Sequence, residues 1–158
     1  GGASGIGAAS AALLAEAGAA VVVADLKAAT DGPRDKAGRF VPHDVTAEAS
    51  GLAGHRAHLA AALQGVDSDH PVLLLAHQPK FVDRAAAAGV DLQLSGHTHG
   101  GQIWPFHYLV RLDQPVLQGL SRHSERTQLY TSRGTGFWGP PLRVFAPSEI
   151  TLLTLRAG

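Results

Sequence analysis

Two short apolar runs, each followed at once by a histidine-bearing turn, constrain the fold of this chain most strongly. Residues 72–76 lead directly into His77, and residues 90–94 lead into the segment 96–101, which holds His97 and His99 between glycines. Short apolar runs bounded by turn residues are typical of buried strands, and the glycines allow a sharp turn after the second run. If the two strands are neighbours in one sheet, all three imidazoles emerge at the same edge. Imidazoles gathered in this way can form a metal site.

Composition limits which ligands such a site can use. The chain has 158 residues, 45% of them hydrophobic, a formal net charge of zero and no cysteine. This length suits one ordinary domain, and the charge gives no reason to expect nucleic acid as a partner. Without cysteine, a metal must be bound by histidine, carboxylate, amide or backbone oxygen, and such ligands suit manganese, zinc, iron or magnesium. We see no membrane-spanning stretch and no signal peptide, and therefore expect a cytoplasmic protein.

The character of the chain changes near residue 50. Residues 1–49 are rich in alanine and glycine, whereas residues 50–158 contain the two apolar runs and the histidines. Hydrophobic periodicity and turn residues predict an α/β chain. The expected helices cover residues 6–17, 52–63 and 81–88, and the expected strands cover 21–23, 72–76, 90–94, 127–132 and 149–155.

The first seven residues read Gly-Gly-Ala-Ser-Gly-Ile-Gly, and acidic residues follow at Asp25 and Asp44. Glycines at a helix start allow a pyrophosphate to approach closely, and a carboxylate about twenty residues later can accept ribose hydroxyls. This segment resembles the start of a short-chain dehydrogenase/reductase. The resemblance implies an NAD(P) site formed by Gly1, Gly5, Ile6, Gly7, Asp25, Asp44 and Val45. A plainer alternative is that the glycines only begin a helix.

The same resemblance argues against hydride transfer. Neither Tyr108 nor Tyr130 is followed by lysine in the Tyr-x-x-x-Lys arrangement of that family, and the strand that precedes the family's glycine loop has no counterpart here. We therefore expect residues 1–49 to be a truncated Rossmann-like loop, helix and strand, without bound NAD(P).

A longer ordered pattern occupies the second part of the chain. It consists of Leu-Leu-Ala-His-Gln-Pro at 74–79, the histidine segment within 89–102, the Gly-, Trp- and Pro-rich segment 134–143 and the pair Glu149-Ile150. Residues from about 52 to 156 resemble the calcineurin-like metallophosphoesterases, particularly a bacterial branch often tied to membranes. The resemblance implies the C-terminal half of a metallophosphoesterase-type β-sandwich with flanking helices, over residues 50–158. It further implies that His77 and His97 bind one divalent metal and His99 a second, and that the substrate is a phosphate ester, either a small molecule or a lipid.

The departures from that family are as informative as the match. Its upstream ligands come from an Asp-x-His strand end, a Gly-Asp pair and a Gly-Asn-His loop, none of which has a counterpart here, and the chain contains no asparagine. Three neutral imidazoles offer no negative charge to offset two divalent cations. We therefore expect the chain to bind one metal weakly, to supply no general acid or base of its own, and to hydrolyse phosphate esters little or not at all.

Two partial resemblances in one chain leave three functional hypotheses open. The first is a metallophosphoesterase or its remnant, the second is an NAD(P)-binding module, and the third is a chimeric chain without catalytic function. A recombined or misassembled chain is the simplest account of the combination. Strand edges without their family partners are expected to promote self-association.

Several other side chains have open alternatives at this stage. Trp138 could line a substrate pocket or pack at a tight turn, and Arg143 could contact a phosphate or pair with Glu149. His55 and His58 could chelate from one helix face, although a solvated helix flank fits them better. The remaining histidines show no partner pattern and are expected on the surface or in loops: His43, His70, His107 and His123.

Overall fold

The computed structural model describes Glu16, residues 20–23, Leu59, Leu63, Val66 and residues 70–155. The strands are β1 (Ala20–Val23), β2 (Val72–Leu75), β3 (Leu92–Ser95), β4 (Gly119–Arg122) and β5 (Gln128–Thr131). The helices are the short 3-10 turns η1 (Pro79–Phe81) and η2 (His99–Gly101) and the α-helices α4 (Val82–Ala87) and α5 (His107–Asp113).

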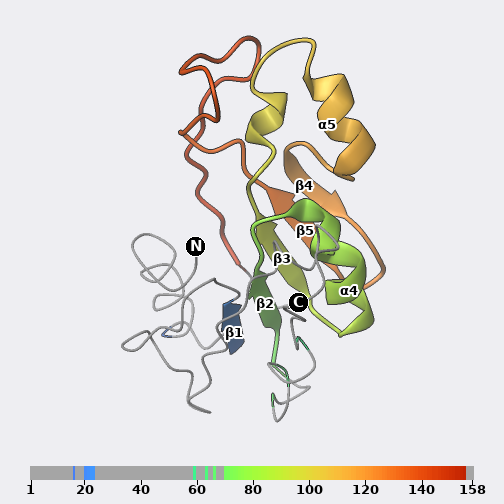
Figure 1. Ribbon diagram of the computed structural model, residues 1–158. Helices are drawn as coiled ribbons and strands as arrows, with labels where there is room; N and C mark the ends of the chain where they lie inside the picture. The colour runs from blue at the N-terminus through green and yellow to red at the C-terminus, as the bar shows by residue number, and fades with distance from the viewer. Residues whose placement is uncertain are drawn as a thin grey trace.

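The strands form one five-stranded sheet in the order β1-β2-β3-β5-β4 (Figure 1). Strands β1, β2, β3 and β5 are parallel, and β4 joins the edge antiparallel to β5. The strands preceding His77 and His97 are therefore neighbours, which meets the condition set in the sequence analysis. Their carboxyl ends meet at the end of the sheet where α5 and the loop after β5 lie, at the top of Figure 1.

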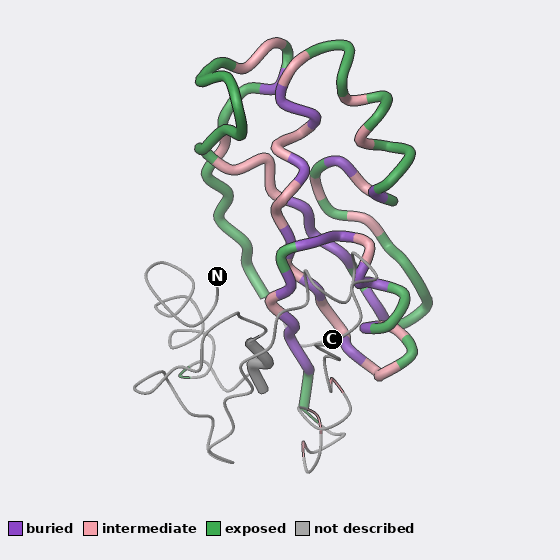
Figure 2. The backbone as a smooth tube through the Cα atoms, in the orientation of Figure 1, coloured by how far each residue is buried: buried purple, intermediate pink, exposed green. Residues whose placement is uncertain are grey.

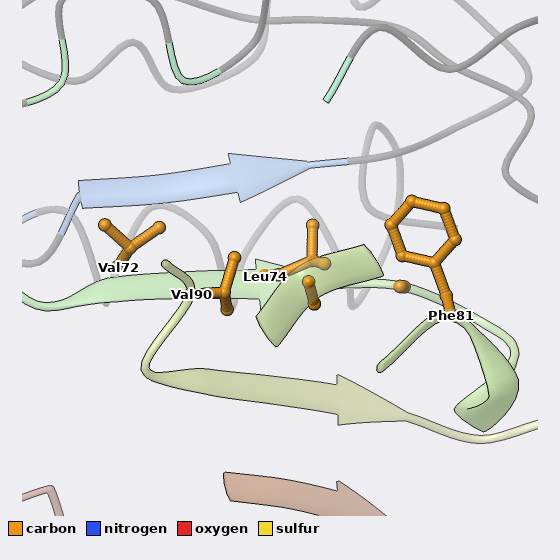
Figure 3. Close-up of a cluster of buried hydrophobic side chains, with 6 residues drawn as sticks. Val72, Leu74, Phe81 and Val90 are labelled. Carbon is orange, nitrogen blue, oxygen red and sulfur yellow. The ribbon is translucent and has the colours of Figure 1, made fainter. Parts of the chain in front are cut away.

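The core of the described region packs between β2 and the η1–α4 segment (Figure 3). Leu74 and Val90 are fully buried, and Phe81 is almost so. Because the apolar run of β2 is covered by α4, it reads as nearly continuous hydrophobic sequence, as expected for a parallel strand. Figure 2 shows the contrast between this buried sheet and the largely exposed α5. The cluster comprises Val72, Leu74, Ala76, Phe81, Ala85 and Val90, with Leu59, Leu63 and Val66 packed against it.

A buried amide joins the loop after β2 to β3. The Nε2 atom of Gln93, in the middle of β3, donates to the carbonyl of Gln78 at 3.2 Å and to Oγ of Ser95 at 2.8 Å. Gln93 is fully buried, so these hydrogen bonds are shielded from water and favour a single arrangement of the loop. The residue after His77 is thereby fixed to the strand that leads to His97.

Several predicted elements are confirmed and others are not. The strands expected at 21–23, 72–76, 90–94 and 127–132 are present as β1, β2, β3 and β5. Residues 149–155 do not form a strand, because no neighbouring strand pairs with them in the described region, and Ile150 and Leu152 are each 92% exposed. The described strands form a single sheet, so the second layer of the expected β-sandwich is not found among residues 20–23 and 70–155.

Other expectations fall on parts of the chain that the structure does not describe. The NAD(P) residues of the dehydrogenase resemblance lie there, so the Rossmann-like unit is not confirmed; within residues 1–49 only Glu16 and β1 are described. β1 pairs with β2 in register from Ala20 opposite Val72, so the two predicted segments share one sheet. No helix in the described residues is both long and apolar enough to cross a bilayer.

Candidate metal centre

Backbone hydrogen bonds extend the pairing of β2 and β3 as far as the histidines. The amide of Ala76 donates to the carbonyl of Leu94 at 3.1 Å, and the amide of Gly96 donates to the carbonyl of His77 at 3.0 Å. His77 and His97 therefore lie next to the last backbone hydrogen bond between the two segments, which joins Gly96 to His77. Their ring centroids are 5.1 Å apart, with the ring planes at 76°.

The segment after β3 adopts an uncommon backbone conformation. His97, His99 and Gln102 all have positive φ angles, of 67°, 50° and 50°. Such angles are uncommon for residues other than glycine and cluster at functional sites. Thr98 anchors this coil, since its buried hydroxyl donates to the carbonyl of Leu117 at 2.6 Å. The coil brings His97 and His99 to the same pocket.

A pocket of about 470 Å³ opens at this end of the sheet. All three predicted metal ligands line it, together with an apolar wall from α5, the turn before it and the loop after β5. Of the two alternatives for Trp138, the structure shows a residue that lines a pocket, and the centroid of its ring lies 5.8 Å from that of Phe106. The lining residues are His77, His97, Thr98, His99, Phe106, Leu109, Val110, Asp113, Gln114 and Trp138.

The surroundings of the first two histidines favour their neutral forms. The pKa of His77 lies below its ordinary value, chiefly because the protein displaces water from the ring and also because His97 is close. The pKa of His97 is lowered mainly by burial, against the opposing effect of the Asp113 carboxylate. Neutral imidazole is the form that binds metals, so both rings are prepared for that role.

Asp113 is a charged residue at the pocket that the sequence analysis did not single out. Its carboxylate accepts two hydrogen bonds from Nζ of Lys80, at 2.9 and 3.1 Å, and one from Nε2 of Gln114 at 2.6 Å. These donors lower the pKa of Asp113. The sequence pattern does not mark Asp113, because its position depends on α5, a helix that the apolar pattern does not predict.

The spacing of His77 and His97 fits a shared divalent cation. Two imidazole nitrogens about 2.1 Å from a tetrahedral metal place their ring centroids roughly 5 Å apart. The observed separation is 5.1 Å. Within the described residues, no three His, Asp or Glu side chains are grouped closely enough to hold a metal ion. The ligand roles of His77, His97 and His99 remain predictions.

Arg143 and Glu149 do not pair with each other. Glu149 instead accepts hydrogen bonds from the backbone amide and the guanidinium of Arg133, at 3.0 and 2.7 Å. The guanidinium of Arg143 is directed to backbone carbonyls around His99. His123 also has a partner that the sequence did not indicate, since its Nε2 lies 3.1 Å from the carboxylate of Asp83.

Comparison with known proteins places the C-terminal region of the chain among relatives of metallophosphoesterases. A protein of Helicobacter pylori named as an uncharacterized metallophosphoesterase is 55% identical over 95 residues, which cover 60% of this chain and 26% of that protein. A protein of the same description from Campylobacter jejuni is 57% identical over 84 residues, covering 53% of this chain and 22% of that protein. A bovine transmembrane protein with a metallophosphoesterase domain is 43% identical over 116 residues, covering 72% of this chain and 26% of that protein.

The chain thus spans about a quarter of the length of these relatives. No protein-family model and no solved structure matches it. The relatives support the metallophosphoesterase resemblance of the C-terminal region, and they give no support to the dehydrogenase resemblance of residues 1–49 or to a chimeric origin.

Proposed function

We propose that this chain carries the C-terminal part of a metal-dependent phosphoesterase site, with His77 and His97 as ligands of one divalent cation and His99 as a ligand of a second. The observation that carries the proposal is the closeness of the first two rings, 5.1 Å apart at the ends of adjacent parallel strands. The relatives named as metallophosphoesterases support the same class of reaction.

The chain's own residues would bind and orient the reacting groups. His77 and His97 are held by the last rung of the β2–β3 ladder, so they need little rearrangement to accept a cation. A divalent metal pair in such enzymes supplies a hydroxide nucleophile at neutral pH and offsets charge on the phosphate oxygens. Manganese, zinc, iron and magnesium all remain suitable for the donor set.

The shape of the pocket supports an organic phosphate ester as the ligand. Its volume of about 470 Å³ is in the range of ordinary small-molecule sites, and Phe106, Leu109 and Trp138 form an apolar wall beside the histidines. The phosphate would face the imidazoles while the organic group lies against α5. A small molecule or the head of a lipid would each satisfy this arrangement.

The proposal includes weak activity of the 158-residue chain taken alone. The described part of the pocket contains three imidazoles and one carboxylate, Asp113, which is already engaged by Lys80. Two divalent cations would therefore meet little negative charge. We expect one cation to bind weakly and hydrolysis to remain near background.

Metal titration tests the ligand assignment. We expect calorimetry to show Mn²⁺ or Zn²⁺ binding to the wild-type chain, with a loss of at least about tenfold in affinity for His77→Ala and His97→Ala. The matched control is His123→Ala, which removes a histidine paired with Asp83 and leaves the pocket lining intact. Equal affinity in His97→Ala and His123→Ala would contradict the ligand assignment.

A hydrolysis assay tests the expected weak activity separately. The probe is bis(4-nitrophenyl) phosphate with added Mn²⁺, and release of nitrophenolate is followed by absorbance. Robust turnover by the pure chain that disappears in His97→Ala would refute the weak-activity part while supporting the metal site.

A further inference from the structure

We propose that Arg143 is a positioning residue that fixes the ring of His99 in the tautomer with hydrogen on Nδ1, which leaves Nε2 free to bind a metal. The inference rests on the proposed function only for the identity of what Nε2 binds. The tautomer itself follows from the hydrogen-bond partners of the two side chains.

The guanidinium of Arg143 has five N–H groups, and carbonyl oxygens from three loop segments can use all of them. Nε donates to the carbonyl of Gly136 at 2.9 Å, and Nη2 donates to the same oxygen at 2.5 Å and to the carbonyl of Arg133 at 2.8 Å. Nη1 donates to the carbonyls of His99 at 3.2 Å and Ala146 at 3.0 Å. The five N–H groups are thus matched by five contacts to carbonyl oxygens.

This arrangement decides the proton on His99. Nδ1 of His99 lies 3.3 Å from Nη2 of Arg143 and 3.3 Å from the carbonyl oxygen of Gly136. Because both N–H groups of Nη2 have shorter contacts with carbonyls, neither is left for Nδ1. A carbonyl oxygen can only accept, so the contact with Gly136 is a hydrogen bond only when Nδ1 carries the hydrogen, which then shares this oxygen with Nε and Nη2 of Arg143.

A hydrogen on Nδ1 leaves the lone pair of the neutral ring on Nε2. A histidine ligand that donates its other N–H to a carbonyl is a common arrangement around bound metals, because the hydrogen bond fixes both the tautomer and the ring orientation. Arg143 supports this indirectly, by holding the Gly136 carbonyl in place and by binding the backbone of His99. Its planar, always charged fork suits this role better than the flexible ammonium of lysine.

Nitrogen NMR of the histidine rings tests the tautomer directly. The chain is labelled with ¹⁵N-histidine, measured near pH 8, above the ordinary histidine pKa of about 6.5, and the His99 signals are assigned by their loss in His99→Gln. We expect wild-type His99 to show a protonated Nδ1 and an unprotonated Nε2. Arg143→Lys should populate both tautomers, whereas the control Arg111→Lys, on the exposed surface of α5, should match wild type.

The wild-type spectrum alone can overturn the inference, so the test does not depend on folding of the variant. A hydrogen on Nε2 of wild-type His99, or the wild-type pattern in a folded Arg143→Lys, would refute it. Added Zn²⁺ should move the Nε2 signal of His99, and movement of Nδ1 instead would also refute it. If Zn²⁺ moves neither nitrogen while Nδ1 carries the hydrogen, the tautomer inference stands and the metal role of His99 in the proposed function fails.

Discussion

Gly101 lies where the segment after β3, which carries His97 and His99, meets α5, and replacing it with alanine should separate the two. Its φ angle is +82°, and an added Cβ would lie 2.5 Å from the Cα atom of His107, the first residue of α5. A side chain in the left-handed region costs about 1–2 kcal/mol. Overlap with a neighbouring backbone adds about 1–3 kcal/mol, since the helix cannot rotate away as a side chain would. We therefore expect Gly101→Ala to lower the free energy of unfolding by about 2–5 kcal/mol.

Gly119 provides a matched control for this prediction. Its φ angle is +80°, and nothing lies within 4 Å of the position that a Cβ would take. Gly119→Ala therefore carries the same backbone strain and the same change in the unfolded chain without the overlap. Urea unfolding followed by circular dichroism should give a midpoint for Gly101→Ala clearly below that of Gly119→Ala, with a stability difference of about 1–3 kcal/mol. Equal midpoints would refute the close contact of the coil with α5.

Two further predictions concern side chains that bind the segment after β5. Gln102→Ala removes a side chain that accepts a hydrogen bond from the amide of Trp138 and donates to the carbonyls of Trp138 and Pro140. We expect the free energy of unfolding, measured in urea, to fall by about 2–4 kcal/mol and the tryptophan emission to change. Hydrogen bonds from Arg133 and Tyr130 help to lower the pKa of Glu149, so its stabilising contribution is present above the unfolded pKa of about 4.3 and is lost as the pH falls through the lower folded value. The stability difference between wild type and Glu149→Gln, measured by urea unfolding, should therefore shrink between about pH 5 and 3, and a constant difference would contradict this linkage.

The sequence could predict the part of the site that follows directly from the apolar runs, namely the strands that end at His77 and His97. The apolar runs before His77 and His97 are long enough to identify buried strands, and parallel strands that are neighbours bring their carboxyl ends to one edge. The signal for α5 is weaker, because the helix has only seven residues and buries none of them, although Leu109 and Val110 line the pocket. The short strand β4 was missed for a related reason, since its residues alternate only between partly buried and exposed.

The contacts that complete the pocket depend on pairs far apart in the chain. Gln102 reaches Trp138 across 36 positions, and Arg143 reaches His99 across 44. Glutamine and arginine are both common surface residues, so neither type signals a buried role by itself. Only the folded arrangement shows that Arg143 binds carbonyls rather than Glu149 or a free phosphate.

The two halves of the histidine site are therefore held by different means, and this has a consequence for metal binding. His77 and His97 are fixed by backbone hydrogen bonds that continue the sheet, whose central strands are the most deeply buried part of the described region. His99 depends on Arg143 and on the carbonyl of Gly136, in a loop whose residues are mostly exposed. Local opening of an exposed loop costs less free energy than disruption of a central strand. Mild denaturant should thus displace the ring of His99 before it releases a cation shared by His77 and His97, so the order of loss follows from how each ring is held.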